Sequence, residues 1–104
     1  MSDYHPDYWE GVEEQVEEKL ELPPMYKVLL HNDNYTTMEF VVEILRQVFN
    51  KDTAEATRIM LLVHKTGHGV CGVFSEDVAE TKVEIVHHLA KKSGFPLRCT
   101  MEEA

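Results

Sequence analysis

The sequence has few features that would direct it to a membrane, to nucleic acid or to the secretory pathway. Its longest uncharged apolar runs span only a few residues, whereas a bilayer-spanning helix needs about 20, and its start lacks the basic and apolar blocks of a signal peptide. Lys and Arg number 10 against 19 Asp and Glu, so no basic patch is available for phosphates or anionic lipids. We therefore expect a cytoplasmic protein that binds neither membranes nor nucleic acids.

Cysteine is also scarce, and its two copies lack the usual catalytic or cross-linking patterns. Cys71 and Cys99 do not form a CxxC pair and are too few to cross-link a small secreted domain, so we predict that both are buried thiols. The six histidines form no four-ligand set with zinc spacing, and no glycine-rich loop precedes a lysine as nucleotide binding requires. The residues thus predict no metal and no cofactor, and a small enzyme that uses Cys71 or His64 is kept as an alternative for which the sequence names no substrate.

The acidic charge is concentrated at the N-terminus. Residues 1–24 contain eight acidic side chains and one lysine and end in a proline pair, a composition typical of a solvated tail or of an arm that a partner captures. A chain of this length has room for one hydrophobic core. We predict a flexible acidic extension over residues 1–24 and a single small domain over residues 25–104.

Hydrophobic periodicity predicts three strands and three helices in that domain. The order β-α-α-β-α-β indicates an α+β fold in which a three-stranded antiparallel sheet packs against the three helices. The strands are expected over residues 25–31, 68–75 and 97–101, and the helices over residues 37–49, 53–65 and 76–92.

Helix ends are marked by residues with known capping preferences. Gly67 and Gly94 follow the second and third helices and suit a left-handed C-cap. The segment from Thr36 to Glu39 fits a capping box in which Thr36 is the N-cap of the first helix. Along the third helix, the apolar period predicts that Val78 faces the core together with the residues that follow it.

An Asn-Asp-Asn run at residues 32–34 stands between the first strand and the first helix. These residues are ordinary turn formers, and a histidine near a helix end, such as His64, is usually a satisfied, partly buried side chain. If the turn and the end of the second helix lie side by side, amide oxygens and a neutral imidazole converge on one cation. The apolar depression beneath them would be lined by Met38, Val41, Met60 and Val63. A cation with an apolar body describes the N-terminal residue of a protein.

Six linked segments of the chain resemble the ClpS adaptors of the bacterial Clp protease. Together they cover about residues 23–104 in unbroken order. The segments are PMYKVLL (24–30), NDNYTTMEFV (32–41), MLLVH (60–64), CGVF (71–74), VAETKV (78–83) and PLRCT (96–100).

This resemblance implies a module that binds the exposed N-terminal Leu, Phe, Tyr or Trp of an N-degron substrate. The adaptor would deliver the substrate to the AAA+ unfoldase ClpA, which feeds the ClpP peptidase, and would itself catalyse nothing. We expect a monomer. The alternative is a generic peptide-binding module of the same fold that serves a different partner.

The resemblance also implies roles for individual residues, carried over by position. Asn32 and His64 would accept hydrogen bonds directly from the α-ammonium, with Asp33 and Asn34 beside them. Asp77 and Lys82 match positions expected to contact the N-terminal domain of ClpA, and the acidic extension would be the arm needed for delivery. The side-chain pocket would be formed by Thr36, Met38, Val41, Met60, Val63 and Leu97.

Two positions depart from the usual family pattern, which reads Asn-Asp-Asp, then Tyr or Phe, then Thr-Pro-Met. Asn34 replaces the second aspartate, which keeps an oxygen acceptor but removes a negative charge near the expected cation. Thr37 replaces the proline at the expected first turn of the helix, where proline is favoured but not required.

Overall fold

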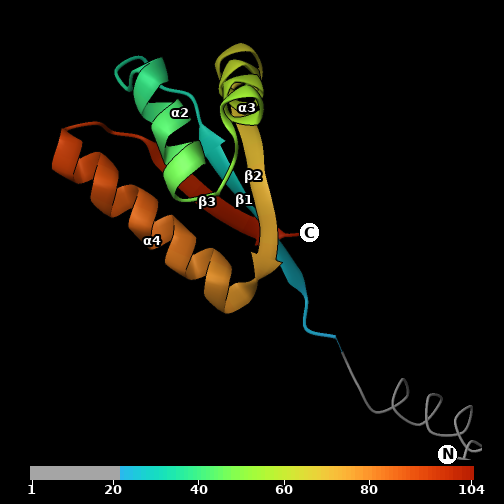
Figure 1. The fold of residues 1–104 in the computed structure, drawn as a ribbon. Coiled ribbons are helices and arrows are strands. Elements are labelled where there is room, and N and C mark those ends of the chain that lie inside the picture. Colours follow the sequence, from blue (N-terminus) through green and yellow to red (C-terminus); the bar gives the residue numbers. More distant parts are fainter. Residues whose placement is uncertain (1–21) are drawn as a thin grey trace, which may run out of the picture.

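The computed structural model describes residues 22–104 and confirms the predicted α+β order (Figure 1). Almost all of the predicted extension over residues 1–24 lies outside this described part. Along the chain, the strands and helices are β1 (Met25–His31), α2 (Met38–Gln47), α3 (Thr53–Thr66), β2 (His68–Ser75), α4 (Glu76–Ser93) and β3 (Arg98–Glu103).

The sheet has β1 at its centre, with β2 and β3 paired antiparallel on either side. The pairing of β1 with β2 shifts after Val28, which lies opposite Gly72, whereas Leu29 lies opposite Val70. Cys71 is therefore the extra residue of a β-bulge, and its side chain is buried. Because β1 is the central strand, the loop after His31 leaves from the middle of the sheet.

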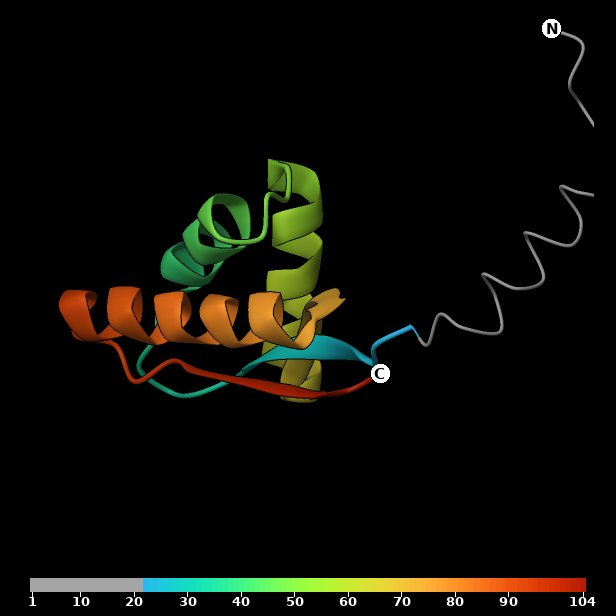
Figure 2. The same ribbon diagram turned by 90° about the horizontal axis from the view of Figure 1, so that it is seen from below.

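Helix α4 lies across the sheet, and α2 is on the same side of the strands (Figures 1 and 2). Helix α3 packs against both α2 and β2. The core that these elements share is apolar. Within residues 22–104, no helix is both long and apolar enough to cross a membrane. The largest fully buried side chains are Leu30, Ile44, Leu45, Ile59, Val28 and Val86.

The glycine caps are confirmed. Gly67 has φ of 96° and Gly94 has φ of 78°, a left-handed conformation that costs glycine little because it lacks a Cβ atom. The predicted burial of Val78 is wrong, since 43% of this residue is exposed. Ala79, the next residue, is fully buried, and successive helical residues point about 100° apart, so the inward stripe of α4 passes beside Val78.

Candidate functional site

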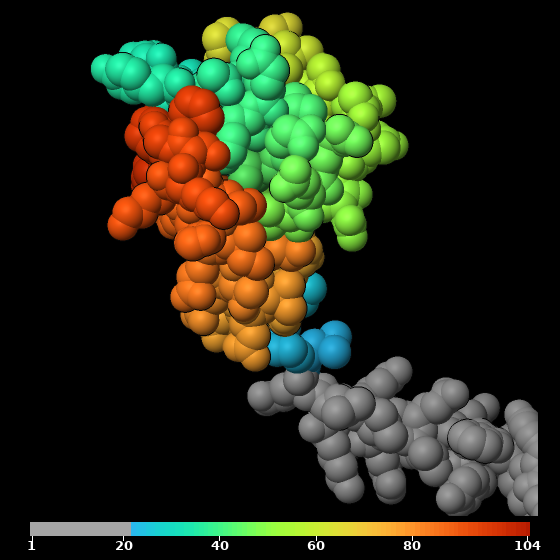
Figure 3. Space-filling view, turned by 60° about the vertical axis from the view of Figure 1, so that its left-hand side comes forward, coloured from blue at the N-terminus to red at the C-terminus, as the bar shows by residue number. Residues whose placement is uncertain are grey.

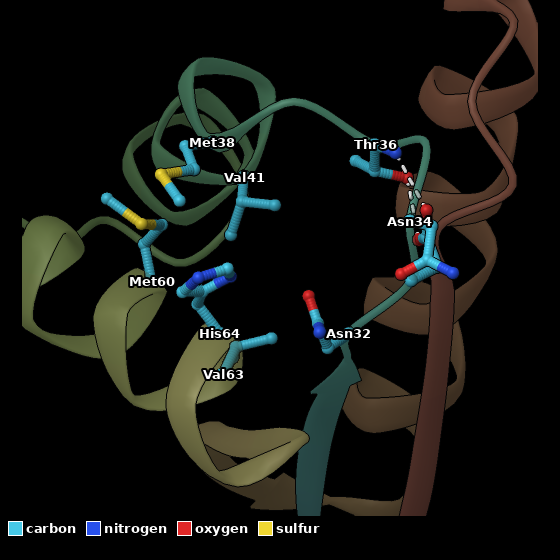
Figure 4. Close-up of a pocket in the computed structure, with 9 residues that line it drawn as sticks. Asn32, Asn34, Thr36, Met38, Val41, Met60, Val63 and His64 are labelled. Atoms are coloured by element: carbon cyan, nitrogen blue, oxygen red, sulfur yellow. Dashed lines mark hydrogen bonds between the residues drawn. The ribbon is translucent and has the colours of Figure 1, made fainter.

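A hollow of about 250 Å³ lies where the loop after β1 meets the start of α2 and the last turns of α3 (Figure 4). Its walls combine oxygen- and nitrogen-bearing side chains from the loop and α3 with apolar side chains from both helices. Every lining residue belongs to the predicted amine-binding or side-chain set. The residues that line it are Asn32, Asp33, Asn34, Thr36, Met38, Val41, Met60, Val63 and His64.

The loop is shaped by the carboxylate of Asp33, which accepts three local hydrogen bonds. One carboxylate oxygen accepts from the amides of Tyr35 and Thr36 at 2.8 and 2.7 Å, and the other accepts from the Thr36 hydroxyl at 2.7 Å. Partial burial raises the pKa of Asp33, but the hydrogen bonds from Thr36 and Tyr35 outweigh this effect and hold the pKa below its usual value. Both carboxylate oxygens therefore accept hydrogen bonds from within the loop, although Asp33 was predicted to help bind an amine.

These bonds also overturn the predicted capping box. The Thr36 hydroxyl donates to Asp33, so it does not cap the helix. Thr37 is the N-cap of α2 instead, and its side-chain oxygen accepts from the Phe40 amide at 3.1 Å. The threonine that replaces the family's proline thus provides a side-chain cap that proline could not.

Helix α2 brings one buried and one exposed side chain to the hollow. Val41 is 6% exposed and belongs to the core, whereas Met38, in the first turn, is 46% exposed. Val63 on α3 is buried like Val41, and Met60, one turn earlier, is half-buried. The hollow consequently has a fixed apolar floor and a wall of two flexible thioether side chains.

A backbone hydrogen bond joins the polar loop to the end of α3. The Asn32 amide donates to the Gly67 carbonyl at 2.8 Å, and the Gly67 amide donates to the Val63 carbonyl at 2.9 Å. Helix α3 also lies so close to β2 that a Cβ atom added at Gly69 would come within 2.9 Å of the Val63 side chain. Asn32 and the last turn of α3, which carries His64, are therefore held side by side.

The Asn32 amide and the His64 ring project into the hollow from its β1 and α3 sides (Figure 4). Asn34 lies on the far side from the two methionines. Within residues 22–104, neither the Asn32 side chain nor the His64 ring hydrogen-bonds another residue. An amide oxygen and an imidazole nitrogen, both acceptors, are left available above an apolar floor.

The chain matches the family described as "ATP-dependent Clp protease adaptor protein ClpS" over residues 21–100. It belongs to the ClpS family. Relatives named ATP-dependent Clp protease adapter protein ClpS include one from Lawsonia intracellularis, 56% identical over 99% of this chain and 95% of the relative. Another, from Desulfatibacillum aliphaticivorans, is 58% identical over 96% of this chain and 95% of the relative.

A solved structure from the same family has the same fold. The structure of Agrobacterium tumefaciens ClpS2 bound to L-phenylalaninamide has a TM-score of 0.77 and 41% sequence identity to this chain. The similarity covers 80% of this chain and 100% of the ClpS2 chain. The predicted ClpS resemblance is thus confirmed in both sequence and fold.

Leu97, the remaining residue of the predicted ClpS side-chain pocket, is placed differently. It does not line the hollow and is 3% exposed, within the same buried core as Val41 and Val63. Leu97 immediately precedes β3, which pairs with the central strand, so its side chain packs into the core.

The two residues predicted to contact the unfoldase lie on α4 and differ in environment. Asp77 is exposed, but Lys82 is half-buried and its ammonium donates to the Val48 carbonyl at 2.6 Å. The same ammonium lies 5.9 and 5.6 Å from the ring centroids of Phe49 and Phe74. Because Val48 is the C-cap of α2, Lys82 joins α4 to the helix that carries Met38 and Val41.

The two cysteines are buried, and the metal-ligating side chains of the described residues do not cluster. Cys71 and Cys99 are free and buried, as predicted. Burial, with a smaller effect of Cys99, raises the pKa of the Cys71 thiol well above its usual range, and burial raises the pKa of Cys99 to about 12. Both thiols stay protonated near neutral pH, and no group of three or more metal-ligating side chains is found in residues 22–104.

Proposed function

We propose that the hollow binds the N-terminal residue of a substrate protein and that the protein delivers this substrate to a ClpA-type unfoldase. The observation that carries the proposal is the placement of the Asn32 amide and the His64 ring above the apolar floor of Val41 and Val63. An α-ammonium has three N–H donors and no acceptor. Two unpartnered acceptors beside an apolar hollow therefore suit an N-terminal residue with a bulky apolar side chain.

The substrate side chain would enter between the two methionines and the valine floor. Leu, Phe, Tyr and Trp fit this surface because their apolar bodies replace water against it, and the unbranched methionine side chains adapt to different shapes. The ClpS2 relative is bound to L-phenylalaninamide, which carries a free α-ammonium and a large aromatic side chain. The same ligand chemistry is proposed for this chain, with Asn34 on the opposite side supporting the ammonium.

Delivery would use a different surface. Asp77 and the neighbouring α4 residues would contact the N-terminal domain of the unfoldase, and the acidic segment 1–24 would act as an arm during the transfer. The adaptor catalyses no reaction and acts in the bacterial cytosol, where the unfoldase and ClpP degrade the substrate.

A degradation assay tests the proposal. Two reporters, identical except that one begins with Leu and the other with Gly, are incubated with ClpA and ClpP with and without this protein. The protein should accelerate degradation of the Leu reporter and leave the Gly reporter unchanged, and Asn32→Ala should strongly reduce the acceleration. Equal effects on both reporters would contradict recognition of the N-terminal side chain.

A further inference from the structure

The sheet has one face that no helix of residues 22–104 covers. Helices α2 and α4 lie on one side of the strands in Figure 2, and their side chains, with those of α3, make up most of the surface seen in Figure 3. Successive residues of a strand point to opposite faces of the sheet. Val28 and Leu30 belong to the core, whereas Leu29 between them lies outside that core cluster although it is only 5% exposed. Leu29 therefore belongs to the other face, which we call the open face.

Strand pairing arranges the side chains of the open face in three rows. Directly opposed residues of antiparallel strands lie on the same face, so each row takes one residue from each strand. The two valines contributed by β2 are 38% and 47% exposed. From β2, β1 and β3 in turn, the first row is Val73, Lys27 and Glu102, the second is Val70, Leu29 and Thr100, and the third is His68, His31 and Arg98.

The third row gathers three nitrogen-bearing side chains. The ring centroids of His31 and His68 are 6.3 Å apart. Burial, followed by the charges of Arg98 and His68, holds the pKa of His31 below its usual value, while Glu102 acts in the opposite direction. The His31 ring is hydrogen-bonded to the Thr100 hydroxyl at 2.7 Å, which can accept as well as donate. The ring can therefore take up a proton and keep this bond, and an anion beside the row would favour that uptake.

We propose that the acidic segment 1–24 of the same chain binds back across the open face. The segment carries eight acidic side chains and one lysine, so its charge is opposite to that of the third row and of Lys27. Its carboxylates would lie beside these groups, and its apolar side chains would cover the exposed valines of β2. The apolar and aromatic residues available in the segment include Tyr4, Tyr8, Trp9, Val12, Val16 and Leu20.

The connection of the segment to the sheet favours it over other occupants. Met25, the residue that follows it, begins the central strand of the same sheet. The third row lies about 20 Å along that strand, and 24 extended residues reach about 80 Å. Single exposed ion pairs are weak, but a tethered ligand has an effective concentration of about millimolar. A second copy is disfavoured because both chains carry a net charge of −9.

Binding of this kind would define a resting state of the free protein. While the segment lies on the open face, its carboxylates and apolar side chains are unavailable to a partner. Protonation of His31 and His68 adds positive charge to the face, whereas the carboxylates of the segment stay ionised down to about pH 4. The resting state should therefore gain population as the pH falls from 7.5 to 6. None of these steps depends on the proposed function of the first hollow.

A spin label on the segment of the full-length chain tests the proposal. Gln15→Cys provides a neutral attachment site, and the native thiols of Cys71 and Cys99 are buried, so the label reacts selectively. We expect the label to broaden the NMR amide signals of the open face and to leave those of the exposed surface of α4 sharp. The broadening should increase at pH 6 and shrink at high salt, because exposed charges are screened. No broadening, or equal broadening of both surfaces, would overturn the proposal.

Two pairs of variants assign the contact to the third row. Arg98→Glu should lower the ratio of bound to free segment about two- to thirtyfold, because it replaces an exposed attraction by a repulsion. Lys91→Glu, the same reversal at an exposed position on α4, should leave the broadening unchanged. His68→Gln should weaken the pH dependence, whereas His88→Gln on α4 should not. Equal effects of the two members of either pair would contradict the proposed site.

A mixed sample distinguishes the chain's own segment from that of a second copy. Spin-labelled protein without isotope is mixed with unlabelled, isotope-enriched protein, so any broadening arises between molecules. We expect sharp signals in this mixture. Broadening of the open face as strong as in the labelled chain itself would show that a second copy occupies the face and would overturn the proposal.

Discussion

The hollow at the end of β1 and the surface of α4 present opposite arrangements of polar and apolar groups. In the hollow, the Asn32 amide and the His64 ring are free of side-chain partners among the described residues, and the two valines of its floor, Val41 and Val63, are buried. On α4, Val78 and Ile85 are 43% and 41% exposed, while the Lys82 ammonium is committed to the Val48 carbonyl.

This difference separates two kinds of recognition on one small domain. A concave site with unpartnered acceptors suits a small cationic group that can be enclosed, whereas a shallow depression on α4, bordered by Asp77, Val78, Thr81, Lys82 and Ile85, suits the surface of another protein. It also separates two roles for charged or polar residues. The Asn32 side chain has no partner among the described residues, whereas the Lys82 ammonium already donates a hydrogen bond within the fold.

The largest effect is expected from Asn32→Ala. This change removes an acceptor of a charge-assisted hydrogen bond, worth about 1.5 to 3 kcal/mol, so affinity for a peptide with N-terminal Leu should fall about tenfold to a hundredfold. Asn34→Ala is the matched control on the far side of the hollow and should weaken binding less. Similar losses in both variants, measured by fluorescence anisotropy, would contradict the special position of Asn32.

Lys82→Met should reduce the stability of the domain in the absence of any unfoldase. The methionine keeps the apolar stem but leaves the part-buried Val48 carbonyl without its donor, which costs about 1 to 2 kcal/mol. Urea denaturation measures the free energy of unfolding. Asp77→Asn, on the same helix but exposed, should change it by less than about 0.5 kcal/mol, and equal stabilities of all three proteins would show that Lys82 is free to serve only a partner.

Met38→Ala should widen the mouth of the hollow. Ile and Val carry two heavy atoms on Cβ and so are broad near the backbone, where the exposed thioether of Met38 stands. We expect a peptide with N-terminal Ile to bind the variant about tenfold tighter than the wild type, a change of about 1.4 kcal/mol. Met38→Leu keeps most of the bulk and should give little gain; if Met38→Ala still rejects Ile, selectivity arises elsewhere.

The smallest effect concerns the loop rather than its ligand. Asp33→Asn keeps the shape of the side chain but lacks a second oxygen for the Thr36 hydroxyl, which should cost about 1 kcal/mol of stability at pH 7. The folded pKa of Asp33 lies below the ordinary 3.8, so its contribution is complete above that value and is lost as the pH falls through the folded pKa. Unfolding free energies of both proteins should therefore converge in acid, and a constant difference would contradict the role of the carboxylate.

The sequence predicted the framework well because the relevant signals are local. The strands over residues 25–31 and 68–75 have the predicted bounds, and Gly67 and Gly94 end their helices as expected. The wrong N-cap reflects competition between adjacent threonines: Asp33 captures the hydroxyl of Thr36, which leaves Thr37 to cap α2. Periodicity alone does not show which of two neighbouring hydroxyls caps the helix.

The site was predictable to the extent that family motifs fix positions along the chain. They identified all residues that line the first hollow, but not the contact between Lys82 and Val48, which are 34 residues apart. The row of His68, His31 and Arg98 on the open face was also missed. These three residues lie far apart in the sequence, and only the register of the strands brings them together.

The most direct test of the account is a calorimetric titration with a peptide that begins with Phe and with the same peptide N-acetylated. Acetylation removes the positive charge and the donors for Asn32 and His64 but leaves the aromatic side chain intact. Two charge-assisted hydrogen bonds at about 1.5 to 3 kcal/mol each predict at least about a hundredfold loss of affinity. Equal binding of the two peptides would show that the hollow recognises an apolar side chain alone and would contradict recognition of the protein N-terminus.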